Sequence, residues 1–118
     1  MPPELRDPAF LADMLDASQA VVRFVQGKTF ENFLNDELLL AGVERKIGII
    51  GEAAQGVSDS LKSAHPEIPW RKIIAQRHVL VHDYGEIMED RIWEVATVFI
   101  PALIGMLQQL LPAPPSNK

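Results

Sequence analysis

The sequence contains no cysteine among its 118 residues. Disulfide bonds, thiolate metal sites and a cysteine nucleophile are therefore excluded, and nothing ties the chain to an oxidising compartment. The first eight residues contain three prolines and three charged side chains, where a signal peptide needs an uninterrupted apolar segment. We therefore expect a cytoplasmic protein.

Long apolar runs and an excess of positive charge are also missing. The most apolar region, residues 95–111, is interrupted by threonine, proline, glycine and two glutamines, which predicts a core helix and no membrane association. The formal charge is −5 and the sequence pI is near 5.1, so a broad basic surface that coats nucleic acid is excluded. Any RNA site must therefore be local, and the acidity fits either a basic partner or simply a solvated surface.

The length and composition are those of one domain. Hydrophobic residues make up 47% of the chain, which is enough for one core and leaves little room for a second. We predict one helical domain over residues 1–111. Residues 112–118 contain three prolines and are predicted to form a disordered tail.

Capping residues and apolar spacing predict a series of helices. An aspartate followed by proline predicts a first helix from Asp7 to about Gly27, with Asp7 as its cap. Thr29 predicts the cap of a short second helix. The pair ending at Asp36 predicts the cap of a long third helix whose apolar residues continue at three- and four-residue spacing to Leu61.

A fourth helix is predicted from about Trp70 to His82, and a fifth from near Met88, with a kink at Pro101. The fifth carries two apolar stripes, which are Met88, Ile92, Val95, Phe99 and Leu103, and Trp93, Ile100, Ile104, Leu107 and Leu111. A helix that is apolar on two sides needs two neighbours, so one stripe predicts a second subunit. The predicted fold is all-α, a four- or five-helix bundle that forms a two-fold homodimer.

The fourth helix places a charge within an apolar stripe. Arg77 falls in the middle of a stripe that consists of Trp70, Ile73, Ile74, Leu80, Val81 and Tyr84. Because a buried unpaired guanidinium is costly, Arg77 must either pair with an acid or line a cleft that binds anions. The acids that could make it a purely structural residue are Glu44, Glu52 and Asp36.

Two histidines, His78 and His82, lie on one face of this helix at the four-residue spacing of two metal ligands. Only Asp83 and the distant His65 could add ligands, so we predict no metal site, and solvated histidines are the ordinary alternative. Arg77 and His82 are five residues apart, about 140° around an ideal helix. A loosened helix end, or two copies facing each other across a two-fold axis, would bring the two groups to one cleft.

The segment that begins at Arg77 resembles the Arg-x4-His-x-Tyr motif of the HepT-like HEPN domains. The first variable position of that motif is typically polar, often asparagine, and is His78 here. The segment 44–54 and Trp93 follow the family in order and spacing, so the resemblance covers roughly residues 7–111.

The resemblance implies a homodimeric endoribonuclease that needs no metal ion or other cofactor. His82 would act as general base or acid, because histidine titrates near neutral pH, and Arg77 would stabilise phosphate charge. His78 and Asp83 are the expected substrate-binding residues. The resemblance also implies a toxin whose antitoxin is a minimal nucleotidyltransferase, with Tyr84 as the acceptor of AMP.

Three alternatives stay open at this point. Tyr84 could simply pack in register with Trp70 and Ile74. The protein could be a catalytically silent dimer that only binds a nucleotidyltransferase. It could also be a generic helical adaptor in which Arg77 is a paired core residue.

Overall fold

Helices form all the regular structure of the part of the chain that the computed structural model describes, residues 2–82 and 89–111, with backbone only for residues 77–82. The elements are η1 (Pro3–Arg6), α1 (Asp7–Val25), α2 (Phe30–Leu34), α3 (Glu37–Gly56), α4 (Asp59–Ala64), α5 (Trp70–His82), α6 (Glu89–Glu94), η2 (Val95–Phe99) and α7 (Ile100–Leu110). No strand occurs within these ranges, so the all-α prediction is confirmed. The predicted tail, residues 112–118, lies outside them.

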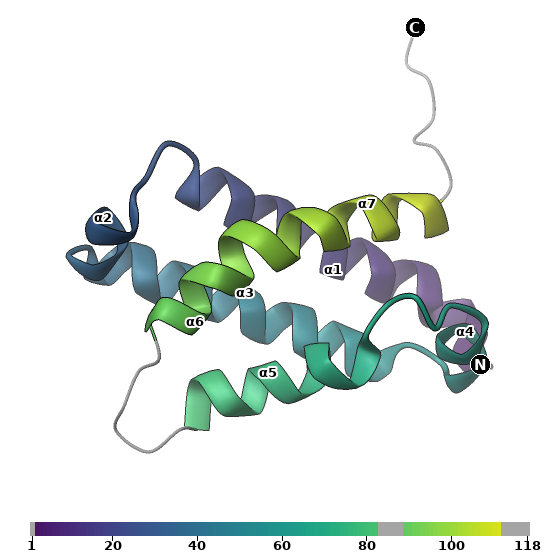
Figure 1. Ribbon diagram of the computed structural model, residues 1–118. Coiled ribbons are helices and arrows are strands. Elements are labelled where there is room, and N and C mark those ends of the chain that lie inside the picture. The colour runs from purple at the N-terminus through teal and green to yellow at the C-terminus, as the bar shows by residue number, and fades with distance from the viewer. Residues whose placement is uncertain (1, 83–88, 112–118) are drawn as a thin grey trace, which may run out of the picture.

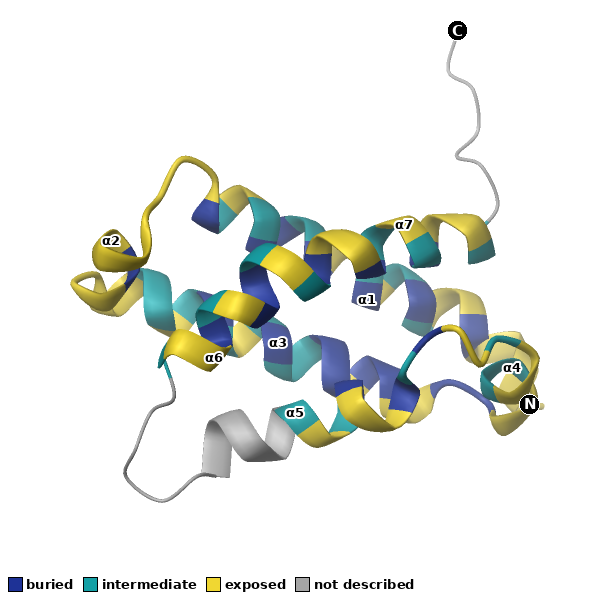
Figure 2. Ribbon diagram, in the orientation of Figure 1, coloured by how far each residue is buried: buried dark blue, intermediate teal, exposed yellow. Residues whose placement is uncertain are grey.

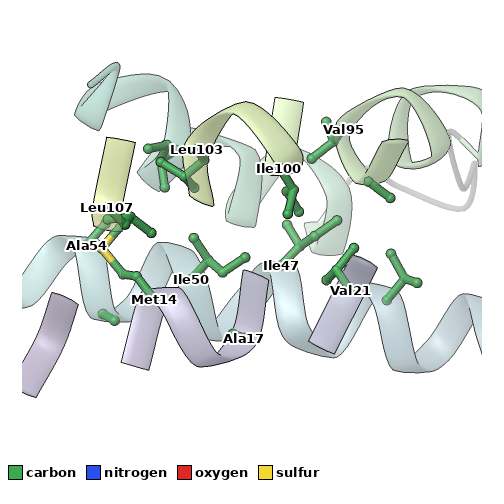
Figure 3. Packing of buried hydrophobic residues seen from close by; sticks show 14 of the residues in the cluster. Met14, Ala17, Val21, Ile47, Ile50, Ala54, Val95, Ile100, Leu103 and Leu107 are labelled. Atoms are coloured by element: carbon green, nitrogen blue, oxygen red, sulfur yellow. The ribbon is translucent and has the colours of Figure 1, made fainter. Parts of the chain in front are cut away.

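The long helices pack side by side in the order α7, α1, α3 and α5 (Figure 1). The core lies where α1, α3 and the last helical segment meet, and each helix contributes one buried face (Figure 2). Figure 3 shows this meeting point, whose labelled residues are Met14, Ala17 and Val21 from α1, Ile47, Ile50 and Ala54 from α3, and Val95, Ile100, Leu103 and Leu107 from the last segment. α5 lies on the outer side of α3, so its position depends mainly on that one contact.

Two of the predicted helix caps are confirmed. Thr29 and Asn32 form a reciprocal capping box at the start of α2, with N···O distances of 2.9 and 3.0 Å. The Asp36 side chain accepts a hydrogen bond of 3.0 Å from the Leu39 N–H at the start of α3. These caps fix the points at which the chain turns from α1 into α2 and from α2 into α3.

The predicted cap of α1 is wrong. Arg6 occupies the capping position and makes no side-chain hydrogen bond there, while Asp7 is the first helical residue. The buried Asp7 carboxylate accepts hydrogen bonds from the backbone N–H of Ser58 at 2.8 Å and from its hydroxyl at 2.6 Å. Asp7 therefore ties the start of α1 to the segment between α3 and α4.

The prediction of one long third helix is also wrong, because this part of the chain forms two helices. α3 ends at Gly56, Val57 is extended, and Ser58 caps α4 by accepting a hydrogen bond of 3.2 Å from the Leu61 N–H. The apolar spacing runs on across the break because Val57 is buried and Leu61 packs against the same core. Periodicity therefore reported the buried face correctly and missed the change in chain direction.

The last helical segment contains a π-helical turn, η2, between α6 and α7. The Ile100 N–H donates to the carbonyl of Val95, five residues back, and the Thr97 hydroxyl donates to the carbonyl of Trp93 at 2.7 Å. Pro101 has no N–H, and the wide turn lies directly before it, where a regular helical hydrogen bond would be lost.

The expectation of two separate apolar faces on this segment is wrong. Its buried face takes Ile92, Val95 and Leu103 from one predicted stripe, and Ile100 and Leu107 from the other. The remaining described members of the stripes are half-buried against the same core. The stripes therefore give no independent argument for a second subunit.

The segment Glu89–Leu110 has the length and apolarity of a membrane-crossing helix, with a mean hydropathy of 1.3 over its most apolar window. Core helices pass the same criterion. Ile92, Ile100 and Leu107 are buried against the rest of the bundle, and 33% of the apolar window is buried inside the structure.

Candidate active site

The candidate catalytic residues fall on the second half of α5 and just beyond it. The backbone of Arg77, His78 and His82 is helical, which confirms the predicted helix from Trp70 to His82. Their side chains, and all of Asp83 and Tyr84, lie outside the described residues. The surroundings of the site therefore come from the first half of α5 and from the helices next to it.

The first half of α5 is firmly anchored. Trp70 is buried, and its indole N–H donates to the carbonyl of His65 at 3.0 Å. Ile73 is buried and Ile74 half-buried, as the predicted stripe requires. Arg77 is four residues after Ile73, so its helical position continues the face that packs on α3.

Residues of α3 and α5 that line one small space show which side of α3 faces α5. Ile73 and Gln76 of α5 line the same small space as Ile47 and Ile50 of α3. The two helices run in opposite directions (Figure 1), so the second half of α5 lies along the first half of α3. Glu44, one turn before Ile47, is thus placed beside the second half of α5.

Glu44 is the acid with the best placement among the three proposed partners of Arg77. The Asp36 carboxylate caps α3, and Glu52 is exposed beyond Ile50, toward the start of α5. Glu44 is half-buried; burial raises its pKa, and the charge of Glu89 raises it further. Whether Arg77 pairs with it lies outside the described residues.

A groove of about 600 Å³ separates α5 from the last helical segment. The lining contains both apolar and charged side chains. The lining residues are Lys72, Ala75 and Gln76 from α5, Arg91 and Glu94 from α6, and Val95, Val98, Phe99 and Ala102 from η2 and α7. Val98 is 67% exposed. The groove begins one turn before Arg77, so it adjoins the candidate catalytic positions.

No metal-binding cluster of three histidine or acidic residues occurs within the described part of the chain. The Glu67 carboxylate accepts a hydrogen bond from the His65 imidazole at 3.1 Å, and the His65 carbonyl accepts one from the Trp70 indole at the start of α5. The pKa of Glu67 is lowered first by a backbone hydrogen bond to its carboxylate and then by the hydrogen bond from the His65 side chain. His82 is at the other end of α5, about 18 Å away along the axis, so His65 cannot join it in one ligand set.

The groove residues are the part of the site that sequence reasoning missed. Lys72 and Gln76 are four residues apart on α5, on a face next to the Trp70 stripe, which was the available signal. Nothing in the local pattern indicated that Glu94 and Val98 face them. That pairing depends on how far α5 stands from the last helical segment.

Comparison with known proteins identifies the family. The family model described as Ribonuclease HepT-like matches residues 14–110. A protein described as a probable ribonuclease HepT, from Thermococcus cleftensis, is 34% identical over 101 residues, covering 86% of this chain and 92% of the relative. A protein of Methanocaldococcus jannaschii described as a putative RNase is 27% identical over 95 residues, covering 80% of this chain and 87% of the relative.

No solved structure gave a significant match to this chain. The family match spans most of α1 and every later helix through α7, including the α5 backbone that carries Arg77 and His82. The chain therefore belongs to the HepT-like ribonuclease family.

Proposed function

We propose that this protein is an endoribonuclease that cleaves RNA without a metal ion, with Arg77 and His82 as the catalytic residues. The observation that carries the proposal is the family match over residues 14–110, with the Arg-x4-His spacing on one described helix beside an open groove. His78 and Asp83 would bind substrate.

The chemistry needs only groups that these side chains supply. A base removes the proton of the 2′-hydroxyl, whose oxygen attacks phosphorus, and an acid protonates the leaving 5′-oxygen. His82 suits a proton transfer because histidine titrates near neutral pH. Arg77 stays charged and presents two parallel donors to phosphate oxygens. The products would be a 2′,3′-cyclic phosphate and a free 5′-hydroxyl.

A homodimer is part of this proposal, and the groove between α5 and η2 supports it. Its apolar lining includes Val98, which is 67% exposed and would gain burial from a partner. The lining also carries both signs of charge, Lys72 and Glu94 among them, which a two-fold-related copy could match. Two copies joined here would bring both α5 helices, and both Arg-x4-His spacings, toward one cleft.

The last part of the proposed function is control of the ribonuclease by a nucleotidyltransferase. In this proposal the cytoplasmic enzyme is the toxin of a toxin–antitoxin pair, and its antitoxin transfers AMP from ATP to the Tyr84 hydroxyl, with release of pyrophosphate. The added phosphate would repel the RNA backbone, and the adenosine would fill the cleft. A Tyr84→Phe variant should then stay toxic in the presence of the partner, with no added AMP on intact-mass analysis.

Cleavage of a labelled RNA in EDTA tests the catalytic proposal. Arg77→Ala and His82→Ala should each reduce the rate by roughly 10²–10⁴-fold with the fold retained. Arg71→Ala, at an exposed position on the same helix, is the matched control and should cleave at close to the wild-type rate. Activity lost in EDTA and restored by a divalent metal would refute the mechanism.

The same experiment separates the alternative function. If the wild type forms a dimer and binds the nucleotidyltransferase but cleaves no RNA under any condition, the protein is a silent binding partner. If Arg77→Ala unfolds the protein while Arg71→Ala does not, Arg77 is a paired core residue.

A further inference from the structure

Three of the large apolar side chains that the structure leaves exposed lie together at one end of the bundle. Phe30 is 37% exposed, Leu34 is 42% exposed and Leu38 is 84% exposed. Leu34 ends α2 and Leu38 lies in the first turn of α3, so the two are adjacent across the short α2–α3 turn. We call these three residues the apolar patch, which lies where Figure 2 colours α2 and the start of α3 mostly as exposed.

The backbone under the apolar patch is firmly held. Phe33 is fully buried, with its ring centroid 5.2 Å from that of Trp93 on α6, and Phe30 contacts the same indole at 6.1 Å. The Asn35 N–H donates to carbonyls of α2, and Asp36 caps α3. Phe33 therefore anchors α2 from inside, while Leu34 and Leu38 contribute little to the bundle.

The charge around the apolar patch is strongly negative. Two segments, 28–38 and 89–94, lie together because α2 contacts α6. Together they contain six acidic and two basic residues. They account for a net −4 of the chain's −5. The negative field extends inward, since the charge of Glu89 helps to raise the pKa of Glu44. We call these two segments the acidic end.

These properties narrow the class of partner. An RNA backbone is repelled by the acidic end. A second copy docked on the apolar patch across a two-fold axis would bring Glu31 and Glu37 of both copies together, which is unfavourable. We propose that the apolar patch docks a basic amphipathic helix of a different protein, whose leucine-like side chains cover Leu34 and Leu38 and whose lysines or arginines face Glu31 and Glu37.

This surface goes beyond the ribonuclease proposal and does not depend on cleavage. The apolar patch and its neighbours Glu31 and Glu37 include none of the candidate catalytic residues and none of the groove residues, although Arg91 and Glu94 of the acidic end line the groove. RNA cleavage by variants of the patch should therefore match the wild type, whatever the outcome of the binding experiment.

Isothermal titration calorimetry with model peptides tests the proposal. The probes are an amphipathic helical peptide of leucine and lysine, its counterpart of leucine and glutamate, and a scrambled leucine–lysine peptide of equal charge. The first should bind the wild type, and the other two should bind at least about tenfold more weakly. The double variant Leu34→Ser/Leu38→Ser should weaken binding of the first by about tenfold or more, because truncating apolar anchors dominates such interfaces.

Matched variants separate a docking surface from general attraction to an acidic protein. Glu31→Lys/Glu37→Lys should weaken binding of the leucine–lysine peptide, whereas Asp13→Lys/Asp16→Lys, with the same charge change on exposed positions of α1, should not. Leu5→Ser, at another exposed apolar position, should bind like the wild type. Equal effects of the two charge variants, or no effect of the leucine variant, would overturn the proposal. Loss of a dimer in the leucine variant by sedimentation would also overturn it, and would assign the patch to a second copy.

Discussion

The hydrogen bonds between Asp7 and Ser58 offer the sharpest test of how this bundle is held together. Asp7 is 4% exposed and Ser58 is 6% exposed. One carboxylate oxygen accepts the Ser58 backbone N–H at 2.8 Å, and the other accepts its hydroxyl at 2.6 Å. Asp7 is also the first residue of α1, where a negative charge is favourable. Asp7→Ala removes both acceptors and leaves a buried N–H without its partner.

The expected cost follows from these contacts. A hydrogen bond to a charged group contributes about 1.5–3 kcal/mol, and a buried donor left without a partner costs about 1–3 kcal/mol. Water can reach part of the vacated space, so we expect Asp7→Ala to lower the free energy of unfolding by about 3 kcal/mol, or roughly 10 °C in Tm. Ser58→Ala keeps the backbone donor but loses its hydroxyl bonds to Asp7 and Leu61, and should cost about 2 kcal/mol.

Urea unfolding of both single variants and of the double variant measures the coupling. The double variant should be less destabilised than the sum of the two singles by about 1–2 kcal/mol, because the shared hydrogen bond is lost only once. Asp13→Ala, at an exposed position of the same helix, should change stability by less than about 0.5 kcal/mol. Additive effects, or a cost of Asp7→Ala no larger than that of the control, would refute this account of the α1 to α4 connection.

Three further outcomes follow from local geometry. In α3, Gly48→Ala should stabilise the protein by about 0.5–1 kcal/mol, because nothing lies within 4 Å of the added carbon. Gly56→Ala should instead destabilise the protein by about 1 kcal/mol, because the added carbon would lie 2.5 Å from the Phe10 ring. Equal shifts in Tm for the two variants would contradict this prediction. Val98→Glu should leave the fold intact and prevent dimerisation in sedimentation experiments, because it places a charge in the groove; a dimer of unchanged strength would exclude that interface. Because the pKa of Glu44 is raised, the Glu44 carboxyl holds its proton more tightly in the folded state than in the unfolded state. The free energy of unfolding of the wild type should therefore fall relative to that of Glu44→Gln as pH rises above about 4.5. A constant difference between the two proteins across pH would contradict this prediction.

The sequence was most informative where one local signal decided the structure. The cap at Thr29, the cap at Asp36 and the buried face of α1 need only near neighbours, and all three are confirmed. Asp7 was misassigned because its partner, Ser58, is 51 positions away in the chain. A capping aspartate and an aspartate bound by a distant serine look the same in the local sequence.

The same limit explains what the sequence missed at the candidate site. The helix that carries Arg77 was predicted from its own residues. The groove beside it requires the distance between α5 and η2, which arises from the packing of each on different neighbours. The π turn before Pro101 shifts which residues of the last segment face inward, and its five-residue hydrogen bond has no marker apart from the proline.

The distribution of charge explains how an acidic protein can act on RNA. The acidic end holds most of the net negative charge, while residues 70–82 contain Arg71, Lys72 and Arg77 and no acidic residue. Charges act over about one Debye length, roughly 8–10 Å in physiological salt, so a phosphate near Arg77 would respond to the charges nearest to it more than to the net charge of the chain. Three cations per subunit neutralise few phosphates and give little binding to RNA of any sequence. For the proposed ribonuclease we therefore expect RNA binding to depend on local contacts near Arg77 more than on a broad charged surface.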